Sequence, residues 1–430
     1  MPYGRCVESG ELLRKKFVVP NHNAGLERHQ TFWAGATINV ADEPTMKTIY
    51  VTQRGARRWR RGHPWIYRSD VEPANEPPGI VRVEDEDGDF LGQALWSPAS
   101  EIHLRRLTGE EEPITKEWWH RKIAEAVAIR EGHGIEGTGY RIIHAEGDNL
   151  PSLIVDRYGD YLSVQLLSAG LEAVRDWVIE AIDEVIKPKA ILLRNDASVR
   201  RHEELEREIE EIRGPIPELV EASEGGIKYM VDMRTGQKTG AFLDERENRI
   251  LMGKRAKGRC LDLFTYQGLF ALHMAEKGDS VIAVDSSAQA LEVAEKNAEL
   301  NGIDNVEFIE ANVFDLLRDY ENSGEQFDTI VLDPPAFARQ RSAIDRALRG
   351  YKEINLRAMR LLAPGGILLS ASCSFHVRRD SFFEMLTSAA ADSGRWLVLE
   401  ELIQQSKDHP AILTVPETGY LKGALLRAAD

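Results

Sequence analysis

A regular alternation of strands and helices between about residue 225 and the C-terminus constrains the fold of this chain more than any other feature. Short apolar runs typical of buried strands lie at residues 260–263, 281–284, 327–332 and 367–370. A helical face follows the second run, with Ser286 or Ser287 as its N-cap, and ends at Gly302. This alternation predicts an α/β fold, in which helices cover both faces of a mostly parallel sheet. The ligand should lie at the carboxyl ends of the strands.

The rest of the chain divides into three sections. Residues 1–45 show no sustained hydrophobic period, so we expect a weakly ordered extension, with Met46 as a candidate true start. Residues 46–115 predict a small β-rich domain with a hairpin over 80–95. Residues 116–224 predict a linking helix and an α+β middle domain, in which the charged segment 200–213 should be an exposed helix or loop. The α/β domain then spans 225–430.

Composition excludes several classes of protein. With 43% apolar and 29% charged residues, the chain is neither wholly disordered nor fibrous. No apolar run reaches the roughly 18 residues that a membrane span needs, and no signal peptide is evident, so we expect a cytoplasmic protein. The three cysteines, Cys6, Cys260 and Cys373, are too sparse for a disulfide framework or a structural zinc site. No metal is therefore expected.

A basic run interrupts an otherwise acidic chain. The net charge is −16, from 54 basic and 70 acidic residues, which taken alone speaks against a nucleic-acid partner. Between Lys47 and Arg68, however, seven side chains are basic and none is acidic. Such a run is either a footprint for RNA phosphates or a solvated strip. The candidate RNA-binding residues are Arg54, Arg57, Arg58, Arg60 and Arg61.

Two acids at strand ends point to the ligand of the α/β domain. Asp262 ends the first strand, and Asp285 ends the second strand, 17 residues beyond Gly268. A carboxylate in the second position suits a ribose diol. Dinucleotide-binding folds also need the G-x-G-x-x-G loop to hold a pyrophosphate, whereas this loop has only Gly268. The pattern therefore favours S-adenosylmethionine, which has no phosphate, although Asp262 could instead cap a helix.

The fourth and fifth strands end in residues suited to chemistry on a base. The fourth ends in Asp333-Pro334-Pro335-Ala336-Phe337, where two prolines stiffen the loop and Phe337 offers a ring for stacking. The fifth ends at Cys373, which has polar neighbours. Cys260 begins a core strand and is expected to be a buried small hydrophobe.

Several short motifs occur in the order found in one known family. They are Gly62–Trp65, Ser97–Ser100, Gly236–Gly240, Phe242–Asp244 with Arg246, Asp333–Pro335, Arg349–Lys352, Ser372–Ser374 and Asp408–Pro410. Over residues 46–430 the chain resembles the large-subunit ribosomal RNA (cytosine-5)-methyltransferase I family. The resemblance implies a PUA-type RNA-binding domain at 46–115 and a class I, Rossmann-like methyltransferase at 225–430.

The resemblance also implies the cofactor, the substrate and the site. The cofactor would be S-adenosylmethionine, held by Lys238, Asp262, Phe264, Gly268, Asp285, Ser286, Asn312 and Asp333. Leu269, Ala336, Asn312 and Ser152 depart from the family pattern, but an Asn312 oxygen still accepts from the adenine amine. The partner would be RNA of the large ribosomal subunit. The Cys373 thiolate would add to carbon 6 of cytosine, and Asp333 would hold N3 and the exocyclic amine.

Two other functions compete with this one. An RNA N-methyltransferase acting on a purine would use Asp333 to Phe337 to orient an amine and would not need Cys373. A non-catalytic RNA-binding assembly factor would use the basic run but not Asp262 and Asp285. The oligomeric state is open, a homodimer included, and so is the base that removes the carbon-5 proton.

Overall fold

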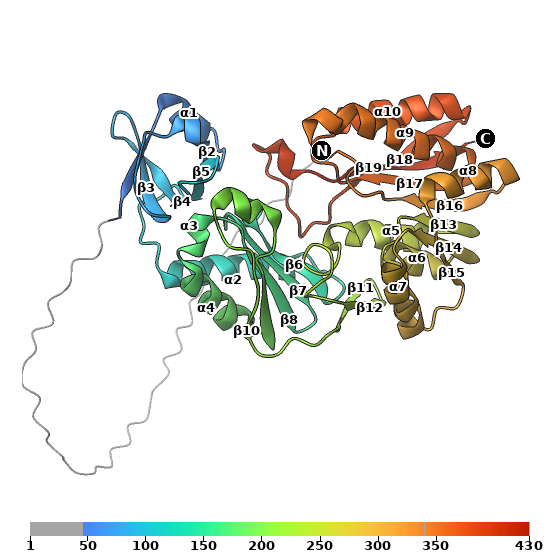
Figure 1. Cartoon of the computed structure of the whole chain (residues 1–430), viewed down its shortest axis with the longest axis horizontal. Helices are drawn as coiled ribbons and strands as arrows, with labels where there is room; N and C mark the ends of the chain where they lie inside the picture. Colours follow the sequence, from blue (N-terminus) through green and yellow to red (C-terminus); the bar gives the residue numbers. More distant parts are fainter. Residues whose placement is uncertain (1–45, 339, 430) are drawn as a thin grey trace, which may run out of the picture. The chain divides into compact units, whose positions relative to one another are not determined.

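The structure is a computed structural model that describes residues 46–338 and 340–429 (Figure 1). The extension expected at 1–45 and Cys6 lie outside the described residues. The described chain contains three β-sheets with helices and one separate hairpin. No helix among these residues is long and apolar enough to cross a bilayer.

The first sheet contains five strands in the order β1-β3-β4-β5-β2, and all but the parallel β1–β3 pair run antiparallel. The strands are β1 (Thr48–Val51), β2 (Trp65–Tyr67), β3 (Gly79–Asp85), β4 (Phe90–Trp96) and β5 (Ile102–Thr108). The hairpin expected over 80–95 is confirmed as β3 and β4. The basic run forms helix α1 (Gln53–Arg60), whose Trp59 is buried and donates to the Leu91 carbonyl at 2.7 Å.

The second sheet follows the long helix α2 (Lys116–Gly132) and has the order β10-β9-β8-β7-β6. Its strands are β6 (Gly139–His144), β7 (Leu153–Tyr158), β8 (Tyr161–Leu166), β9 (Ala190–Arg194) and β10 (Ile209–Arg213), with helices α3 (Ala169–Glu172) and α4 (Arg175–Ile186) between β8 and β9. The interpretation of 200–213 as helix or loop was wrong in part. β10 is an edge strand, so its charged side chains face water while its backbone pairs with β9.

A hairpin of β11 (Val220–Glu224) and β12 (Ile227–Val231) precedes a seven-stranded sheet. This sheet has the order β15-β14-β13-β16-β17-β19-β18. The first five are parallel, and β19 and β18 are antiparallel to their neighbours, which confirms a mostly parallel sheet. The strands are β13 (Arg259–Leu263), β14 (Ser280–Asp285), β15 (Val306–Glu310), β16 (Phe327–Leu332), β17 (Leu362–Ser372), β18 (Leu397–Gln404) and β19 (Lys422–Ala428).

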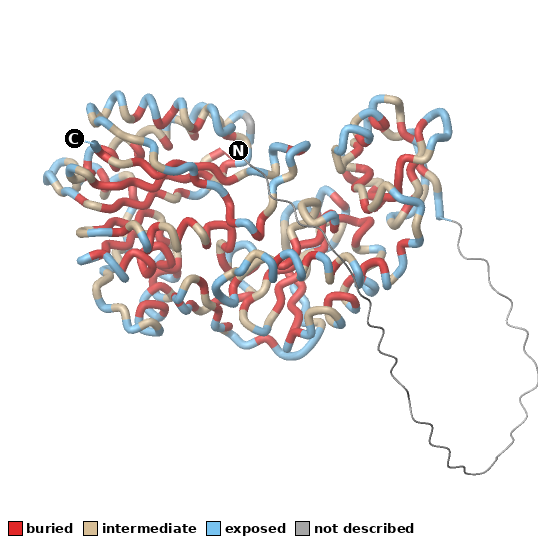
Figure 2. Tube along the Cα trace, turned by 180° about the vertical axis from the view of Figure 1, so that it is seen from behind, coloured by how far each residue is buried: buried red, intermediate tan, exposed pale blue. Residues whose placement is uncertain are grey.

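Helices cover both faces of this sheet (Figure 1). On one face lie α5 (Arg246–Arg255), α6 (Leu269–Ala275) and α7 (Ala288–Asn301), and on the other α8 (Val313–Ser323), α9 (Ile344–Arg360) and α10 (Arg379–Ser393). Figure 2 shows the central strands buried and the outer sides of the helices exposed. The limits of the three domains stay predictions.

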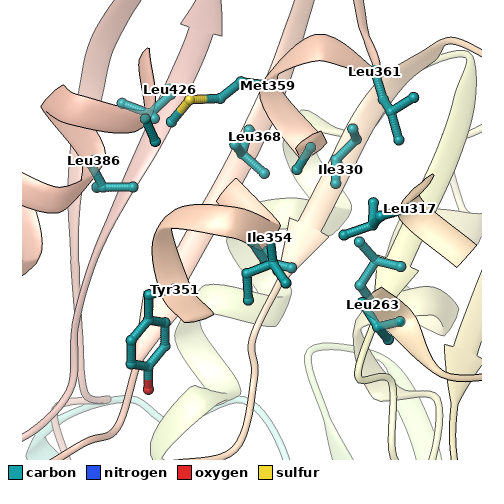
Figure 3. Packing of buried hydrophobic residues seen from close by; sticks show 14 of the residues in the cluster. Leu263, Leu317, Ile330, Tyr351, Ile354, Met359, Leu361, Leu368, Leu386 and Leu426 are labelled. Carbon is teal, nitrogen blue, oxygen red and sulfur yellow. The ribbon is translucent and has the colours of Figure 1, made fainter. Parts of the chain in front are cut away.

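Side chains alternate between the two faces of the sheet along each strand, so each face has its own hydrophobic core. Ile330 and Leu368 pack with Ile354 of α9 in one cluster (Figure 3). Val331, the neighbour of Ile330 in the chain, packs in another cluster with Met252 of α5. Successive side chains of a strand point to opposite faces, so an unbroken apolar run fills both cores.

A buried aspartate of the α/β domain, Asp408, connects this domain to the middle section. Asp408, in the loop after β18, pairs with Arg246 at the start of α5 through Oδ2 to Nη1 at 2.7 Å. The same carboxylate accepts the backbone N–H of Arg141 in β6 at 2.8 Å, and Arg130 of α2 donates to the Asp408 carbonyl at 3.1 Å. Asp408 therefore holds three distant segments together. This contact gives the Asp408–Pro410 motif a structural role.

Removing this carboxylate should destabilise the protein. Asp408→Ala leaves the Arg246 guanidinium buried without its counter-charge, which should cost about 3–5 kcal/mol in the free energy of unfolding. Urea denaturation measures the loss against Asp319→Ala, a control at an exposed position of α8. Equal effects of the two substitutions would contradict this role for Asp408.

Candidate active site

A cavity of about 330 Å³ lies at the carboxyl ends of the strands, where the sheet order reverses between β13 and β16. Ligands of open α/β sheets bind at such a switch point. Four loops that follow strands contribute to its wall, and so does the segment that leads into α5. The wall includes Gln237, Lys238, Phe242, Asp244, Glu245, Arg249, Phe264, Tyr266, Asp285, Ser286, Asp333, Pro334, Pro335 and Cys373.

Asp285 connects two of these loops. One carboxylate oxygen accepts the backbone N–H of Tyr266 at 3.0 Å, and the other accepts that of Ser287 at 3.0 Å. The side chain is half-buried and lines the cavity, as predicted for a ribose ligand. Ser286 and Ser287 also line the cavity, and Ser287 in addition caps α7 by accepting from the Ala290 N–H.

Asp262 does not line the cavity. Its Oδ2 accepts from the Thr265 hydroxyl at 2.5 Å and from the Ala271 N–H at 3.0 Å, so the carboxyl caps helix α6. This is the alternative that the sequence left open. Burial raises the pKa of Asp262 to about 7. The buried carboxyl therefore fixes α6 and the loop before it rather than contacting a ligand in the cavity.

Two other predicted cofactor residues also serve the fold. Gly268 has a φ of +83° at the start of α6, and a Cβ there would lie 3.0 Å from Cβ of Ala294. Both observations demand glycine at this turn. Asn312 caps α8, with its side-chain oxygen accepting the Phe314 N–H at 2.9 Å. Neither residue is in the cavity wall.

Lys238 and Phe264 do line the cavity, and both adopt a positive φ. The Lys238 ammonium lies 2.7 and 2.6 Å from the two oxygens of Asp244, and the Tyr420 hydroxyl donates to Asp244 at 2.6 Å. Burial raises the pKa of Asp244, but Lys238 and nearby donors lower it more, so it falls well below its usual range. Asp244 is thus the ionised acid of the cavity.

Two serines hold Cys373 toward the cavity. Ser372 donates to the Tyr351 hydroxyl at 3.0 Å, and the Ser374 hydroxyl lies 2.9 Å from the same oxygen. Tyr351 belongs to the Arg349–Lys352 motif and is buried on α9. Because Cys373 lies between the two anchored serines and lines the cavity, its thiol is directed to the cavity side.

The cavity raises the pKa of both Cys373 and Asp333. Burial and the nearby Asp333 raise the pKa of the Cys373 thiol to about 12. Burial and the charge of Asp244 raise the pKa of Asp333 to about 7. At neutral pH the thiol is therefore the resting form of Cys373, and Asp333 is divided between its acid and its carboxylate.

Three charged residues near the thiol had no signal in the sequence. Glu245 and Arg249 line the cavity. Lys422 of β19 is buried and donates to the backbone carbonyls of Ser374 and Tyr420, and burial lowers its pKa to about 8. Their part in the site depends on strand and helix packing, which no short motif records.

The structure does not place Phe337 for stacking on a substrate. Its ring packs 4.7 Å from the Tyr351 ring and 6.1 Å from the Phe314 ring, between centroids. It is not in the cavity wall. Phe337 thus supports the Asp333 loop from behind.

Three of the five candidate RNA-binding arginines already pair with buried carboxylates. Arg54 and Arg58 pair with buried Asp70, and Arg60 pairs with buried Asp85 at 2.6 Å. Arg57 and Arg61 are exposed, and their side chains make no ion pair or hydrogen bond within residues 46–338 and 340–429. Only these two offer unpaired charge to phosphate.

Known proteins share this arrangement. Residues 49–109 match the model of a PUA-like domain, and residues 254–414 match that of a methyltransferase domain. The ribosomal RNA large subunit methyltransferase I of Aeromonas hydrophila is 40% identical over 395 residues, which cover 89% of this chain and 99% of that protein. The protein of that name from Shewanella amazonensis is 41% identical over 378 residues, 85% of this chain and 96% of that one.

Solved structures share the fold as well. A structure assigned to the SAM-dependent methyltransferases, from Streptococcus mutans, matches 89% of this chain and all of its own at a TM-score of 0.75 and 20% identity. Another, of a methyltransferase complexed with SAH, matches to the same extent at a TM-score of 0.76. Fold and site thus define a methyltransferase that carries a PUA-like domain. The chain belongs to the ribosomal RNA large subunit methyltransferase I family.

Substitution of the two unpaired arginines should weaken RNA binding. Replacing Arg57 and Arg61 with alanine should reduce the salt slope of RNA binding by up to about two, because each phosphate contact contributes roughly one. The melting temperature should not change. The control replaces Arg201 and Arg346, which are exposed elsewhere, and removes the same charge. If the two double substitutions reduce the salt slope equally, the basic residues of α1 form a solvated strip and not a phosphate-binding surface.

Proposed function

We propose that this protein transfers a methyl group from S-adenosylmethionine to carbon 5 of a cytosine in large-subunit ribosomal RNA. The observation that carries the proposal is Cys373, a thiol held toward the cavity beside the weakly acidic Asp333. The substrate is inferred from the relatives, which are named for ribosomal RNA of the large subunit. The cysteine distinguishes this reaction from methylation of a purine nitrogen, which needs no thiol.

The cavity fits S-adenosylmethionine. The half-buried Asp285 carboxylate would accept from the ribose hydroxyls, and Phe264 and Ser286 also belong to the wall. The loop has no glycine-rich cradle for a pyrophosphate, which this cofactor lacks. When bound, the cofactor supplies the methyl group. A structure of the same fold is complexed with SAH, the demethylated product.

The chain's own groups would prepare the base. The Cys373 sulfur adds to carbon 6, and the electron pair displaced from the ring collects at the edge that holds N3 and the exocyclic amine. Asp333 holds that edge, and its pKa of about 7 lets it give or accept a proton there. The Cys373 thiol has a pKa of about 12, so it must lose its proton during the reaction rather than rest as a thiolate.

The location and the oligomeric state of the protein are part of the same proposal. A cytoplasmic location is inferred from the proposed substrate, which is ribosomal RNA. A homodimer stays a prediction, and sedimentation velocity of the full chain would distinguish it from a monomer. The base that takes the carbon-5 proton is not assigned.

Loss of the Asp285 carboxylate should weaken cofactor binding. Asp285→Ala removes a charged acceptor. The binding free energy for S-adenosylmethionine should weaken by about 1.5–3 kcal/mol, which raises the Kd roughly ten- to 150-fold. Calorimetry measures the change against Asp304→Ala, an exposed aspartate beyond α7. An unchanged Kd would place the ribose contact on another residue.

Cys373→Ala should abolish turnover while cofactor binding and the melting temperature persist. RNA with 5-fluorocytosine at the target should trap a covalent adduct on Cys373, because fluorine cannot leave as a proton does. The matched control is Cys260→Ala. Cys260 is buried in β13, so its loss should lower stability and leave the chemistry intact.

The result also separates the proposed reaction from its competitors. If Cys373→Ala methylates RNA at a comparable rate, methylation of a purine nitrogen takes its place. If the protein binds RNA but not S-adenosylmethionine, it is an assembly factor. Peptide mapping of the adduct identifies the reacting cysteine directly.

A further inference from the structure

A second carboxyl belongs to the same cavity and has no assigned role. Glu245 ends the short 3-10 helix η4 (Leu243–Glu245), directly before α5, and lines the cavity together with Asp333 and Cys373. Its side chain is buried. Its Oε1 has no hydrogen-bond partner in the described part of the chain. An unpaired polar atom buried in a ligand cavity is costly unless a ligand pairs with it.

The other oxygen of Glu245 is held in place. The Asn248 amide, one turn along α5, donates to Oε2 at 2.5 Å and also to the Gln404 carbonyl at 3.1 Å. The charged groups around Glu245 are Asp333, Asp244 and the more distant Arg249, which is itself paired with Glu224. Burial and the first two of these raise the pKa of Glu245 well above its usual range. The surroundings of Glu245 therefore favour its protonated, neutral form.

The hydrogen bond from Asn248 determines which oxygen of Glu245 carries the acidic hydrogen. Oε2 accepts from Asn248 and so behaves as the carbonyl oxygen of the acid. The hydroxyl hydrogen then belongs to Oε1, the unpaired oxygen. Glu245 thus offers the cavity a hydrogen-bond donor, whereas an ionised carboxylate could only accept.

We propose that Glu245 donates a hydrogen bond from Oε1 to ring nitrogen N3 of the target cytosine, while Asp333 accepts from the exocyclic amine. The proposal rests on the proposed function. An enzyme reads an extruded base along its Watson–Crick edge. Cytosine presents an acceptor at N3 beside an amine donor, and uracil presents the reverse. A donor at Glu245 with an acceptor at Asp333 selects cytosine and rejects uracil.

The same contact supplies a proton to the reaction. When the Cys373 sulfur–carbon 6 bond forms, the S–H bond breaks and the thiol proton passes to the Asp333 carboxylate. The ring π electrons shift toward carbon 4, an electron pair moves onto N3, and N3 takes the proton of Glu245, which becomes a carboxylate. After carbon 5 has been methylated and has lost its proton to water, the carbon 6–sulfur bond breaks and the sulfur takes its proton back from Asp333. N3 then returns its proton to Glu245, which restores the acid.

A test at the level of single atoms needs the target cytosine first. Mapping 5-methylcytosine in large-subunit ribosomal RNA, with and without this protein, locates it. The probes are short RNA fragments around that position with cytosine, uracil or 3-deazacytosine at the target, the last of which has carbon in place of N3. The protein variants are wild type, Glu245→Leu, Glu245→Gln and the control Glu295→Gln, an exposed position on α7.

Binding of the fragments tests the contact to N3. Wild type and Glu295→Gln should bind the cytosine fragment about three- to tenfold more tightly than the 3-deazacytosine fragment, the worth of one hydrogen bond. Glu245→Leu should bind both equally. If Glu245→Leu keeps the preference and the wild-type melting temperature, the assignment of Glu245 to N3 is wrong.

Turnover tests the proton transfer. Glu245→Gln keeps a donor for N3 but has no acidic proton, so KM should stay near that of wild type while kcat falls about 10²- to 10⁴-fold. A merely structural role would raise KM as well or lower the melting temperature, and either result would overturn the assignment.

The 5-fluorocytosine adduct separates the two proposals. An adduct on wild-type Cys373 with an unaltered Glu245→Gln rate overturns only this inference. No adduct on wild type overturns the proposed function and this inference with it.

Discussion

Burial around the ion pair between Lys238 and Asp244 governs the protonation of the neighbouring acids Asp333 and Glu245. Among the described residues, Lys238 is the one lysine that lines the cavity, and both oxygens of Asp244 contact its ammonium. Burial and the Asp244 charge raise the pKa of Asp333, and the Lys238 ammonium lowers it by less. Asp333 and Glu245 thus tend to carry protons or to wait for a ligand, because unpaired charges in a buried site are costly.

The backbone frame of the site depends on parts that do not react. Asp262 fixes the first turn of α6, Tyr351 anchors the serines on either side of Cys373, and Asp408 connects α5 to the middle section. All three residues are buried or almost fully buried, and each makes more than one hydrogen bond. The Cys373 thiol and Asp333 therefore stand on rigid strand ends, as a precise site requires.

Much of the fold and of the candidate site was predictable from the sequence. The other features were not, for physical reasons. The parallel strands, the ligand edge and the places of Asp285 and Cys373 follow from periodicity and strand ends. Asp262, Gly268 and Asn312 share the strand-end signal, but they serve helix caps and a tight turn, because capping and ligand binding use the same residue types at the same place. Glu245 had no signal, since its protonation depends on Asp333 and Asp244, which meet it only in the folded chain.

The arginine run shows how local charge misleads when its partners are distant in sequence. Asp70 follows the run and Asp85 lies on β3, and together they pair with three guanidinium groups. Helix α1 then offers Arg57 and Arg61 to phosphate, and two contacts provide little sequence-independent affinity. In a chain with a net charge of −16, weak attraction to RNA backbone leaves selection to the contacts made with the target itself. The read-out of the base edge by neutral acids is the part of the site suited to that selection, because it depends on hydrogen-bond direction rather than on charge.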